Sequence, residues 1–393
     1  MPTIVPITVT TVADNILNHN IIDTILIKVA SRCNIDCSYC YVYNMGDDNW
    51  SRLPKFMDGS TIDGLCNNLA ELASSQKASF SVVLHGGEPF LLGKKKLEAL
   101  LLRLRRVLSE SYPISIQTNG VLISNELLDI CSTYRTSVAV SLDGPQQVHD
   151  RLRVGHHGEG TFDAVMKGLR LLQNHRDNQF LNAGLLAVID PDSDVGEVYS
   201  FFKSLGAPSV DFLYKDGNHD RLPDGKSTIE SVEYGEWMRK LLQIYLLDSQ
   251  PTPIRVIDDM LKVLLGGAST KEGMGVTNFG IIIIDTDGTV MKNDTLKSSF
   301  NGADKFSQAL NIKNGSVLDF LRSPEFLAYR EMQRPSHISC LSCPQLSLCG
   351  GGMILHRWSS LRGFDNPSIY CSDQLYFIDH MRNALKNILE HAY

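Results

Sequence analysis

Runs of apolar, β-branched residues alternate with segments of helical spacing through the first half of the chain. The runs occur at 24–30, 80–84, 113–117, 137–142, 181–189 and 209–214. Between them, apolar residues recur at the three- and four-residue spacing of an amphipathic helix, over 60–75, 94–110, 123–134, 161–175 and 194–206. Such alternation predicts βαβ units and a parallel sheet. Six strands of this kind predict an α/β fold with a partial (β/α)6 barrel of the TIM type.

The pattern changes after residue 215. A loop rich in Gly, Pro and Asp is expected over 215–227, followed by helices at 231–247 and 255–265. The apolar segment 279–292 predicts a β-hairpin around Asp287-Gly288. The stretch 335–372 has little regular pattern and would need a bound group to hold it together. A last helix is expected over 373–390, with Ser372 as its N-cap.

These changes divide the chain into four expected parts. They are an N-terminal arm, the barrel, a pair of bridging helices, and a C-terminal domain that ends in a helix, over 1–20, 21–227, 228–278 and 279–393.

Composition and charge narrow the classes of function. The 393 residues are 43% hydrophobic and 21% charged, as in an ordinary globular protein. A net charge of −7 lacks the basic footprint that nucleic acids require, so no nucleic acid partner is expected. The chain contains no apolar stretch long enough to span a bilayer and does not begin with a secretion signal. We therefore expect a cytoplasmic protein without a membrane partner.

Nine cysteines are unusual for the reducing cytosol, and seven of them form two groups. The groups are Cys33, Cys37 and Cys40, and then Cys340, Cys343, Cys349 and Cys371. Clustered thiols in a reducing compartment indicate metal or cluster ligands rather than disulfides. The two remaining cysteines, Cys66 and Cys131, lie in apolar helical patterns and are expected to be buried.

The first cysteine group follows the first predicted strand directly. Three residues separate Cys33 from Cys37, and two separate Cys37 from Cys40. Three thiolates on one short loop can hold three irons of a [4Fe–4S] cluster and leave the fourth iron open for a small molecule. The alternative is zinc, which prefers four ligands with paired spacing in structural sites.

This loop resembles the signature of the radical S-adenosylmethionine (SAM) enzymes. Further family motifs follow the next strands: Gly86-Gly87-Glu88-Pro89 matches the GGEP motif, Gln117-Thr118-Asn119-Gly120 the QTNG turn, and Ser141 and Arg153 follow in order. The resemblance implies a [4Fe–4S] cluster on Cys33, Cys37 and Cys40 whose open iron binds SAM. It also implies SAM contacts from Tyr39, Gly86, Gly87, Glu88, Pro89, Asn119, Ser141 and Arg153. Arg151 competes with Arg153 for the SAM carboxylate.

The second cysteine group resembles the C-terminal SPASM domain of peptide-modifying radical SAM enzymes, such as the anaerobic sulfatase-maturating enzymes. Four thiolates fill all four irons, so Cys340, Cys343, Cys349 and Cys371 imply a closed auxiliary [4Fe–4S] cluster, with zinc as the alternative. Those relatives carry a second auxiliary cluster. Two of its cysteine positions are Asn293 and Met353 here. We therefore expect one auxiliary cluster.

Substrate-pocket residues are also implied. Asp294 matches a pocket aspartate of the sulfatase-maturating relatives and would act as a base if its pKa suits that task. The alternative is an aspartate that only satisfies a turn. His85 and Gln117 are expected to line the same pocket, although His85 could equally be a core histidine.

Several short sequence segments also resemble those of the peptide maturases that form three-residue cyclophanes. Among them are Cys40-Tyr41-Val42-Tyr43-Asn44 and Gly363-Phe364-Asp365-Asn366-Pro367. The implied reaction joins an aromatic side chain of a ribosomal precursor peptide to the Cβ of a residue two positions on. The implied partners are that peptide and an electron donor such as flavodoxin or ferredoxin. Leader recognition falls either to the chain itself or to a separate leader-peptide-binding protein. Thioether formation, formylglycine formation and epimerisation are alternatives, and a SAM-binding iron–sulfur sensor or electron-transfer protein is a hypothesis from another class.

Overall fold

A single sheet of eight strands, in the order β10-β9-β1-β3-β4-β5-β7-β8, forms the centre of the fold. The computed structural model describes residues 22–269, 271–276 and 280–391, and the expected arm over 1–20 lies outside them. Six neighbouring strands pair in parallel: β1 (Thr24–Ala30), β3 (Ser81–Gly86), β4 (Ile114–Thr118), β5 (Thr136–Ser141), β7 (Asn182–Val188) and β8 (Val210–Leu213). Each predicted apolar run forms one of these strands, so the strand prediction is confirmed.

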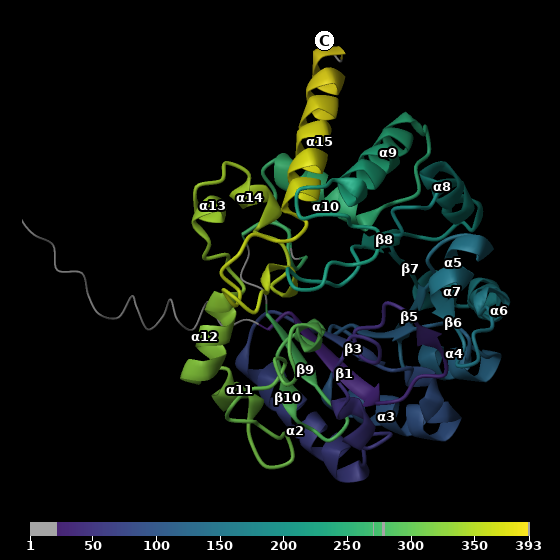
Figure 1. The fold of residues 1–393 in the computed structure, drawn as a ribbon. Helices are drawn as coiled ribbons and strands as arrows, with labels where there is room; N and C mark the ends of the chain where they lie inside the picture. The colour runs from purple at the N-terminus through teal and green to yellow at the C-terminus, as the bar shows by residue number, and fades with distance from the viewer. Residues whose placement is uncertain (1–21, 270, 277–279, 392–393) are drawn as a thin grey trace, which may run out of the picture.

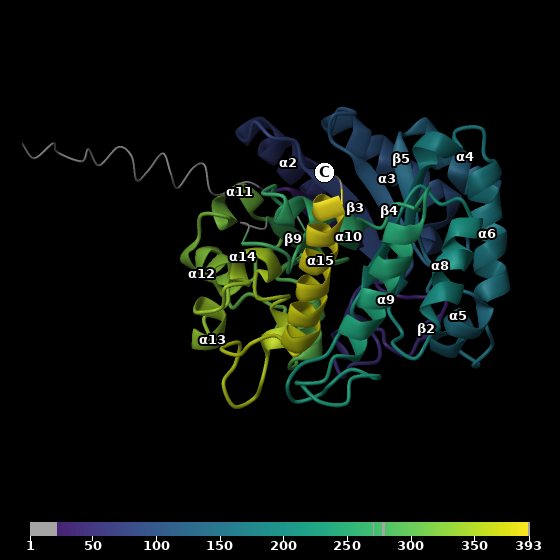
Figure 2. The ribbon, with the colours of Figure 1, turned by 90° about the horizontal axis from the view of Figure 1, so that it is seen from above.

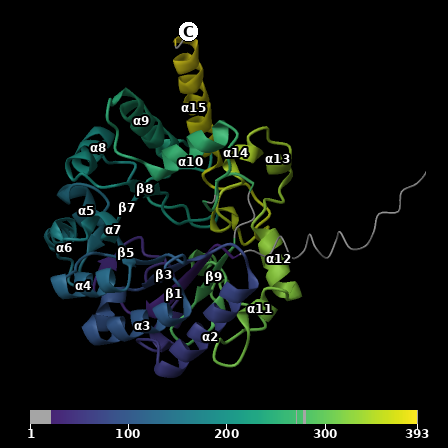
Figure 3. The same ribbon diagram turned by 180° about the vertical axis from the view of Figure 1, so that it is seen from behind.

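Helices cover the outer face of this curved sheet (Figure 1; Figure 3). They are α2 (Gly59–Ser75), α3 (Gly93–Val107), α4 (Asn125–Thr133), α6 (Phe162–Asn174) and α8 (Val195–Ser204). Polar side chains start several of them: Asp58 accepts from the backbone of Thr61, and Ser124 accepts from that of Leu127. Cys66 and Cys131 are buried on the inner faces of α2 and α4, as expected.

The predicted hairpin extends the sheet. Its strands β9 (Ile281–Ile284) and β10 (Val290–Met291) are antiparallel, and β9 pairs in parallel with β1. Gly288 has a φ of +91°, which glycine adopts without strain at this tight turn. Because β10 runs antiparallel to β9, the chain leaves β10 in the direction opposite to β1, and Asp294, which follows β10, lies 2.7 Å from Lys28 in β1.

Short connecting elements complete the barrel half. They are β2 (Asp36–Cys37), η1 (Asn49–Arg52), η2 (Pro89–Leu92), α5 (Gln146–Leu152), β6 (Arg153–Val154) and α7 (Asn178–Leu181). The strands β2 and β6 pair with each other and place Cys37 opposite Arg153.

The C-terminal part closes the other side of the molecule (Figure 1; Figure 2). It contains α9 (Glu233–Leu247), α10 (Arg255–Leu264), η3 (Asp294–Ser298), α11 (Val317–Phe320), α12 (Pro324–Met332), α13 (Ile338–Leu341), α14 (Leu346–Cys349), η4 (Leu355–Arg357) and α15 (Cys371–His391). The expected N-cap at Ser372 is wrong, because α15 already begins at Cys371. A fully buried ion pair of 2.6 Å between Lys226 and Asp373 ties the start of α15 to the loop after β8.

Within the described ranges, no helix combines the length and the apolar character that crossing a bilayer requires.

Candidate functional site

The first cysteine group lies on the loop that leaves β1. Backbone amides approach the sulfurs, with Ile35 bonding to Cys33, and Val42 and Tyr43 to Cys40. Burial, with the neighbouring thiols adding to it, raises the pKa of Cys33 to about 12 and that of Cys40 to about 11. The structure therefore brings the three thiols together. Ligation by positively charged irons would supply the counter-charge that their thiolate forms need.

The Gly86-Gly87-Glu88-Pro89 turn presses against this loop. A Cβ on Gly87 would lie 2.1 Å from the carbonyl oxygen of Arg32, and one on Gly86 would lie 2.2 Å from that of Ala30. Only glycine permits so close a backbone approach. The two glycines thus form a cradle beside the thiols.

The Glu88 carboxylate is fully buried and locks this turn to the next one. It accepts hydrogen bonds from the backbone amides of Phe90 (2.9 Å) and Asn119 (2.8 Å) and from the Thr118 hydroxyl (2.8 Å). Glu88 therefore bridges the ends of β3 and β4, and its SAM contact stays a prediction.

Arg153 and Tyr39 form a polar group beside Cys37. The Arg153 guanidinium donates to the Tyr39 hydroxyl (2.7 Å), which donates to Asp143 (2.7 Å). Burial, opposed by the positive charge of Arg153, leaves the pKa of Cys37 raised. Arg151 instead pairs with Asp190 and is half-exposed. Of the two arginines, Arg153 is the one next to the cysteine loop.

Two further predicted residues face the same region. The Asn119 amide donates to the Cys33 sulfur at 3.6 Å, and Gln117 donates to the Ser141 hydroxyl at 2.9 Å. The structure adds His156, whose Nε2 lies 3.1 Å from the Cys33 carbonyl oxygen. The sequence gives no sign of a site role for His156, because a histidine in a polar loop looks like any other surface residue.

The second cysteine group is also assembled. Backbone amides of Gln345 and Gly351 donate to the sulfurs of Cys343 and Cys349, each at 3.4 Å. Burial raises the pKa of Cys371 to about 11, with the other three thiols of the group adding to the shift. Amides directed at sulfur stabilise thiolate ligands.

Zinc and a cluster place different demands on these thiols. Across the described ranges, no three His, Cys, Asp or Glu side chains are arranged to hold one metal ion. A single zinc needs its ligands around one centre, whereas a four-iron cluster binds each thiolate through a separate iron.

Asn293 and Met353 lie against the same loop. The Asn293 amide donates to both carboxylate oxygens of Glu272, at 2.7 and 2.9 Å. The neighbouring Gly273 packs on Met353, because a Cβ there would lie 2.9 Å from the Met353 nitrogen. The two positions where relatives are expected to carry cysteines therefore contact neighbouring residues of one loop. At the first position, the Asn293 amide and the Glu272 carboxylate form a hydrogen-bonded pair.

A buried charged group lies around Asp294, at the start of η3. The Lys28 ammonium is 2.7 Å from one Asp294 oxygen and 4.0 Å from Asp285, and the Tyr41 hydroxyl donates to Asp294 at 3.0 Å. Burial would raise the pKa of Asp294, but Lys28 and then His85 outweigh it and hold the pKa below its usual value. Lys28 therefore stabilises the carboxylate form of Asp294, and the role of Asp294 as a base stays a prediction.

His85 lies beside this pair. Burial lowers the pKa of His85, and the charges of Asp294 and Lys28 act on it in opposite directions. Its Nδ1 is buried without a hydrogen-bond partner in the described part of the chain. Lys28 was missed by the sequence analysis, although a lysine inside the apolar run 24–30 is a usable signal.

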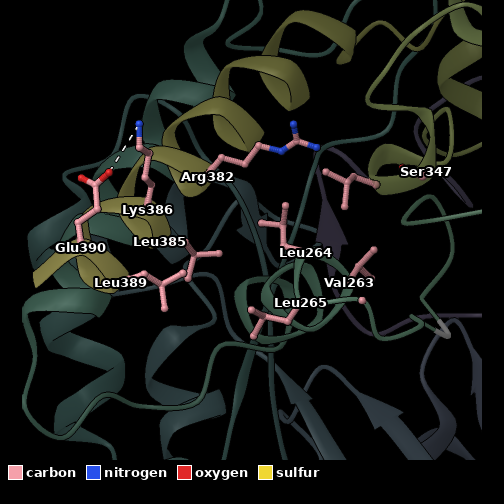
Figure 4. Close-up of a pocket in the computed structure, with 11 residues that line it drawn as sticks. Val263, Leu264, Leu265, Ser347, Arg382, Leu385, Lys386, Leu389 and Glu390 are labelled. Carbon is pink, nitrogen blue, oxygen red and sulfur yellow. Dashed lines mark ion pairs between the residues drawn. The ribbon is translucent and has the colours of Figure 1, made fainter. Parts of the chain in front are cut away.

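A separate groove lies between α10, α14 and α15 (Figure 4). Its volume is about 790 Å³, and Leu264, Leu265, Leu348, Leu385 and Leu389 contribute apolar walls. None of the predicted site residues lines it.

Comparison with known proteins agrees with this geometry. Residues 27–202 match the radical SAM superfamily. A cysteine-type anaerobic sulfatase-maturating enzyme of Clostridium perfringens is 24% identical over 374 residues, covering 93% of this chain and 98% of that enzyme.

Two solved structures share the fold. Native anSMEcpe with bound AdoMet has a TM-score of 0.78 at 22% identity, covering 93% of this chain and 98% of that one. Streptococcus suis SuiB bound to the precursor peptide SuiA has a TM-score of 0.60 at 14% identity, covering 88% and 75%. These likenesses confirm the predicted α/β partial barrel with a SPASM-like C-terminal domain. Residues 27–202 are thus similar to the radical SAM superfamily, and the motifs named above lie at the strand ends within this matched segment.

Proposed function

We propose that this enzyme modifies a ribosomally synthesised peptide by joining an aromatic side chain to the Cβ of the residue two positions on. The product would be a three-residue cyclophane, and two hydrogens would be lost for each link. The partners in this proposal are the precursor peptide and an electron donor such as flavodoxin or ferredoxin. A separate leader-binding protein would join them if the chain itself does not recognise the leader.

The thiols divide between two clusters in this proposal. Cys33, Cys37 and Cys40 would hold the SAM-binding cluster, and Cys340, Cys343, Cys349 and Cys371 the auxiliary one. When bound, the reduced cluster and SAM supply a 5′-deoxyadenosyl radical that removes a hydrogen atom from the substrate.

The chain's own residues would bind and orient SAM. Arg153 supports this role by its position opposite Cys37, where a planar guanidinium can pair with a carboxylate. Tyr39 is held in place by Arg153 and Asp143, and Asn119 reaches the Cys33 sulfur. The Gly86-Gly87 cradle leaves backbone groups accessible where side chains would collide. Ser141, joined to Gln117, completes the set.

One observation carries the choice of reaction. Asn293 and Met353 contact the same loop. The Asn293 amide is hydrogen-bonded to the Glu272 carboxylate, and Met353, which carries a thioether, packs on Gly273. This departs from the sulfatase-maturating pattern at both cysteine positions together. It favours a reaction that needs a single auxiliary electron acceptor, and the cyclophane-type sequence phrases point the same way.

The pocket residues fit a peptide substrate. Lys28, Asp294 and Tyr41 form a fixed polar group that can bind a peptide backbone or orient an aromatic ring at the end of the sheet. Burial keeps water from this group, which preserves its orientation during the reaction.

Sulfatase maturation is the second candidate. Alignment over 93% of the chain with a sulfatase-maturating enzyme, and an aspartate at the matched position 294, favour it. It would convert a Cys or Ser of a sulfatase peptide to formylglycine.

The test is tandem mass spectrometry of the short peptide encoded beside this protein, after anaerobic co-expression. Loss of two hydrogens, with no backbone fragments between an aromatic residue and the residue two positions on, supports the proposal. A mass change confined to a Cys or Ser would move the assignment to thioether or formylglycine formation. Co-expression with Cys33→Ala is the control, and no modification is expected with it. A sensor or electron-transfer protein would release no 5′-deoxyadenosine.

A further inference from the structure

Three carboxylates, one buried and two partly buried, gather where the barrel meets the C-terminal part. They are Asp294 at the start of η3, Glu272 in the loop before β9, and Asp216, three residues after β8. The negative charges of Asp294 and Glu272 both act on Asp216, so the three groups are neighbours. They differ in what their oxygens already bind.

Two of the three already bind hydrogen-bond donors. One Asp294 oxygen, Oδ2, is bound by the Lys28 ammonium and the Tyr41 hydroxyl. Glu272 accepts from the Asn293 amide through both of its oxygens. These contacts stabilise the ionised form of both carboxylates.

Asp216 is different. Its side chain is 18% exposed, and in the ranges that the structure describes its oxygens accept no hydrogen bond. The nearest basic group is His356 Nε2, 3.9 Å from Asp216 Oδ1. That imidazole is only 2% exposed, and its Nε2 has no hydrogen-bond partner within the described residues. An unpartnered buried nitrogen that faces an uncommitted carboxylate is a costly arrangement, and it indicates that a proton or ligand is meant to occupy the gap.

The surrounding contacts fix this pair. The Tyr370 hydroxyl donates to the carbonyl oxygen of Lys215 at 2.7 Å, which holds the backbone next to Asp216. The Tyr370 ring also packs edge-on against His356, with centroids 4.9 Å apart. The next residue along the chain is Cys371, a proposed ligand of the auxiliary cluster. The pair thus lies beside the proposed electron acceptor.

We infer that Asp216 accepts the proton released when the cross-linked aromatic ring regains its aromaticity. His356 then accepts a hydrogen bond from protonated Asp216. This inference rests on the proposed function. In the step, the ring carbon that has formed the new C–C bond loses its hydrogen as a proton. The proton goes to an Asp216 oxygen, and the remaining electron goes to an oxidised iron–sulfur cluster. One C–H bond breaks, the ring is oxidised by one electron, and the cluster is reduced by one.

The electrostatics agree with this role. Burial, followed by the charges of Asp294 and Glu272, raises the pKa of Asp216 to about 7. Burial lowers the pKa of His356 to about 3, so its ring is neutral and can accept a hydrogen bond from protonated Asp216. Tyr41 and Tyr370 also feel the charge of Asp216 and, with Asp294, Glu272 and His356, are the titratable groups facing it. Two carboxylates with separated pKa values have separate roles: Asp294 stays ionised, and Asp216 takes the proton.

The experiment compares Asp216→Asn with Asp224→Asn, an exposed carboxylate in the same loop. Reconstituted enzyme, SAM and the co-encoded peptide are incubated anaerobically, and cross-linked peptide is measured per 5′-deoxyadenosine released. In Asp216→Asn this ratio is expected to fall about tenfold or more while 5′-deoxyadenosine still forms, because loss of a general base slows only the later step. Asp224→Asn should match the wild type. Asp216→Glu, which restores a carboxylate, should recover part of the ratio.

The pH dependence supplies an independent readout. The wild-type ratio should fall as the pH drops through about 7, because Asp216 is then protonated, and Asp216→Asn should lack this limb. Burial also raises the pKa of Glu272 to about 7, so infrared titration of the holoenzyme should show protonated carboxyl bands with midpoints near 7 from both groups, and Asp216→Asn should lose only one of them. If Asp216→Asn matches Asp224→Asn in both the ratio and the pH profile, this inference is overturned and the proposed function stands. If the wild-type enzyme cross-links no peptide, the proposed function fails and this inference fails with it.

Discussion

The buried ion pair between Lys28 and Asp294 gives the sharpest stability prediction. Both side chains are at most 4% exposed, and their charged atoms are 2.7 Å apart. At an effective dielectric constant near 20, such a pair attracts by about 6 kcal/mol, and the Lys28–Asp285 pair at 4.0 Å by about 4 kcal/mol. Much of this offsets the desolvation of the charges, so removing one partner costs about 3–5 kcal/mol.

The two halves of the pair are not equivalent. Asp294→Asn leaves Lys28 with Asp285, so we expect a loss near 3 kcal/mol in the free energy of unfolding. Lys28→Met leaves two buried carboxylates without a cation, so we expect a loss near 5 kcal/mol. The control is Lys94→Met, which breaks an exposed pair with Glu126 at the same 2.7 Å distance and should cost less than about 1 kcal/mol.

The assay is anaerobic urea unfolding of each variant, followed by circular dichroism at several pH values. The Asp294 pKa is lowered from 3.8, so its contribution is present above that pH and is lost as the pH falls through the lowered value. The Lys28 pKa is raised from 10.5, so its contribution is present below that pH and is lost above it. Between these two pH limits, the differences in the free energy of unfolding between the variants and the wild type should reach their full size. Equal costs for the two substitutions, or costs no larger than that of Lys94→Met, would refute the reasoning.

Three further outcomes are expected. Iron analysis of the reconstituted wild type should give about eight irons per chain, and Cys33→Ala and Cys340→Ala should each lose about four, because the two clusters are separate. Arg153→Lys should weaken SAM binding in equilibrium dialysis by about tenfold, whereas Arg151→Lys should leave it unchanged, because only the former lies opposite a cysteine of the SAM loop. Gly87→Ala should abolish SAM binding without unfolding the sheet, since its Cβ would lie 2.1 Å from a backbone oxygen; retained binding, measured the same way, would contradict the cradle.

The distribution of apolar residues was enough to predict the strands and helices of the barrel. Parallel strands buried on both faces require continuous apolar runs, and the helices that cover them need one apolar face. The pattern therefore located all six parallel strands. It did not show that the hairpin would join the sheet beside β1, because strand order depends on contacts between segments more than 200 residues apart.

Candidate cofactor residues were also accessible from the sequence, since ligand spacing on one loop is a local property. Cys33, Cys37 and Cys40 need only a short loop to come together, and turns that follow successive parallel strands must share one end of the barrel. What the sequence could not provide was the protonation chemistry. In the sequence Asp294 is one pocket aspartate among others, and only the structure shows that the Lys28 ammonium lies 2.7 Å from it.

The chain by itself thus determined the fold class and the two thiol groups, because each depends on local spacing or on residue type. The tertiary structure decided the rest. It placed Lys28 on Asp294, joined Glu272 to Asn293, and left Asp216 uncommitted beside His356. Burial and charge set the pKa of each carboxylate, and both are properties of the assembled neighbours rather than of the residue. The neighbours that set the pKa of each aspartate therefore come together only when distant segments are in contact.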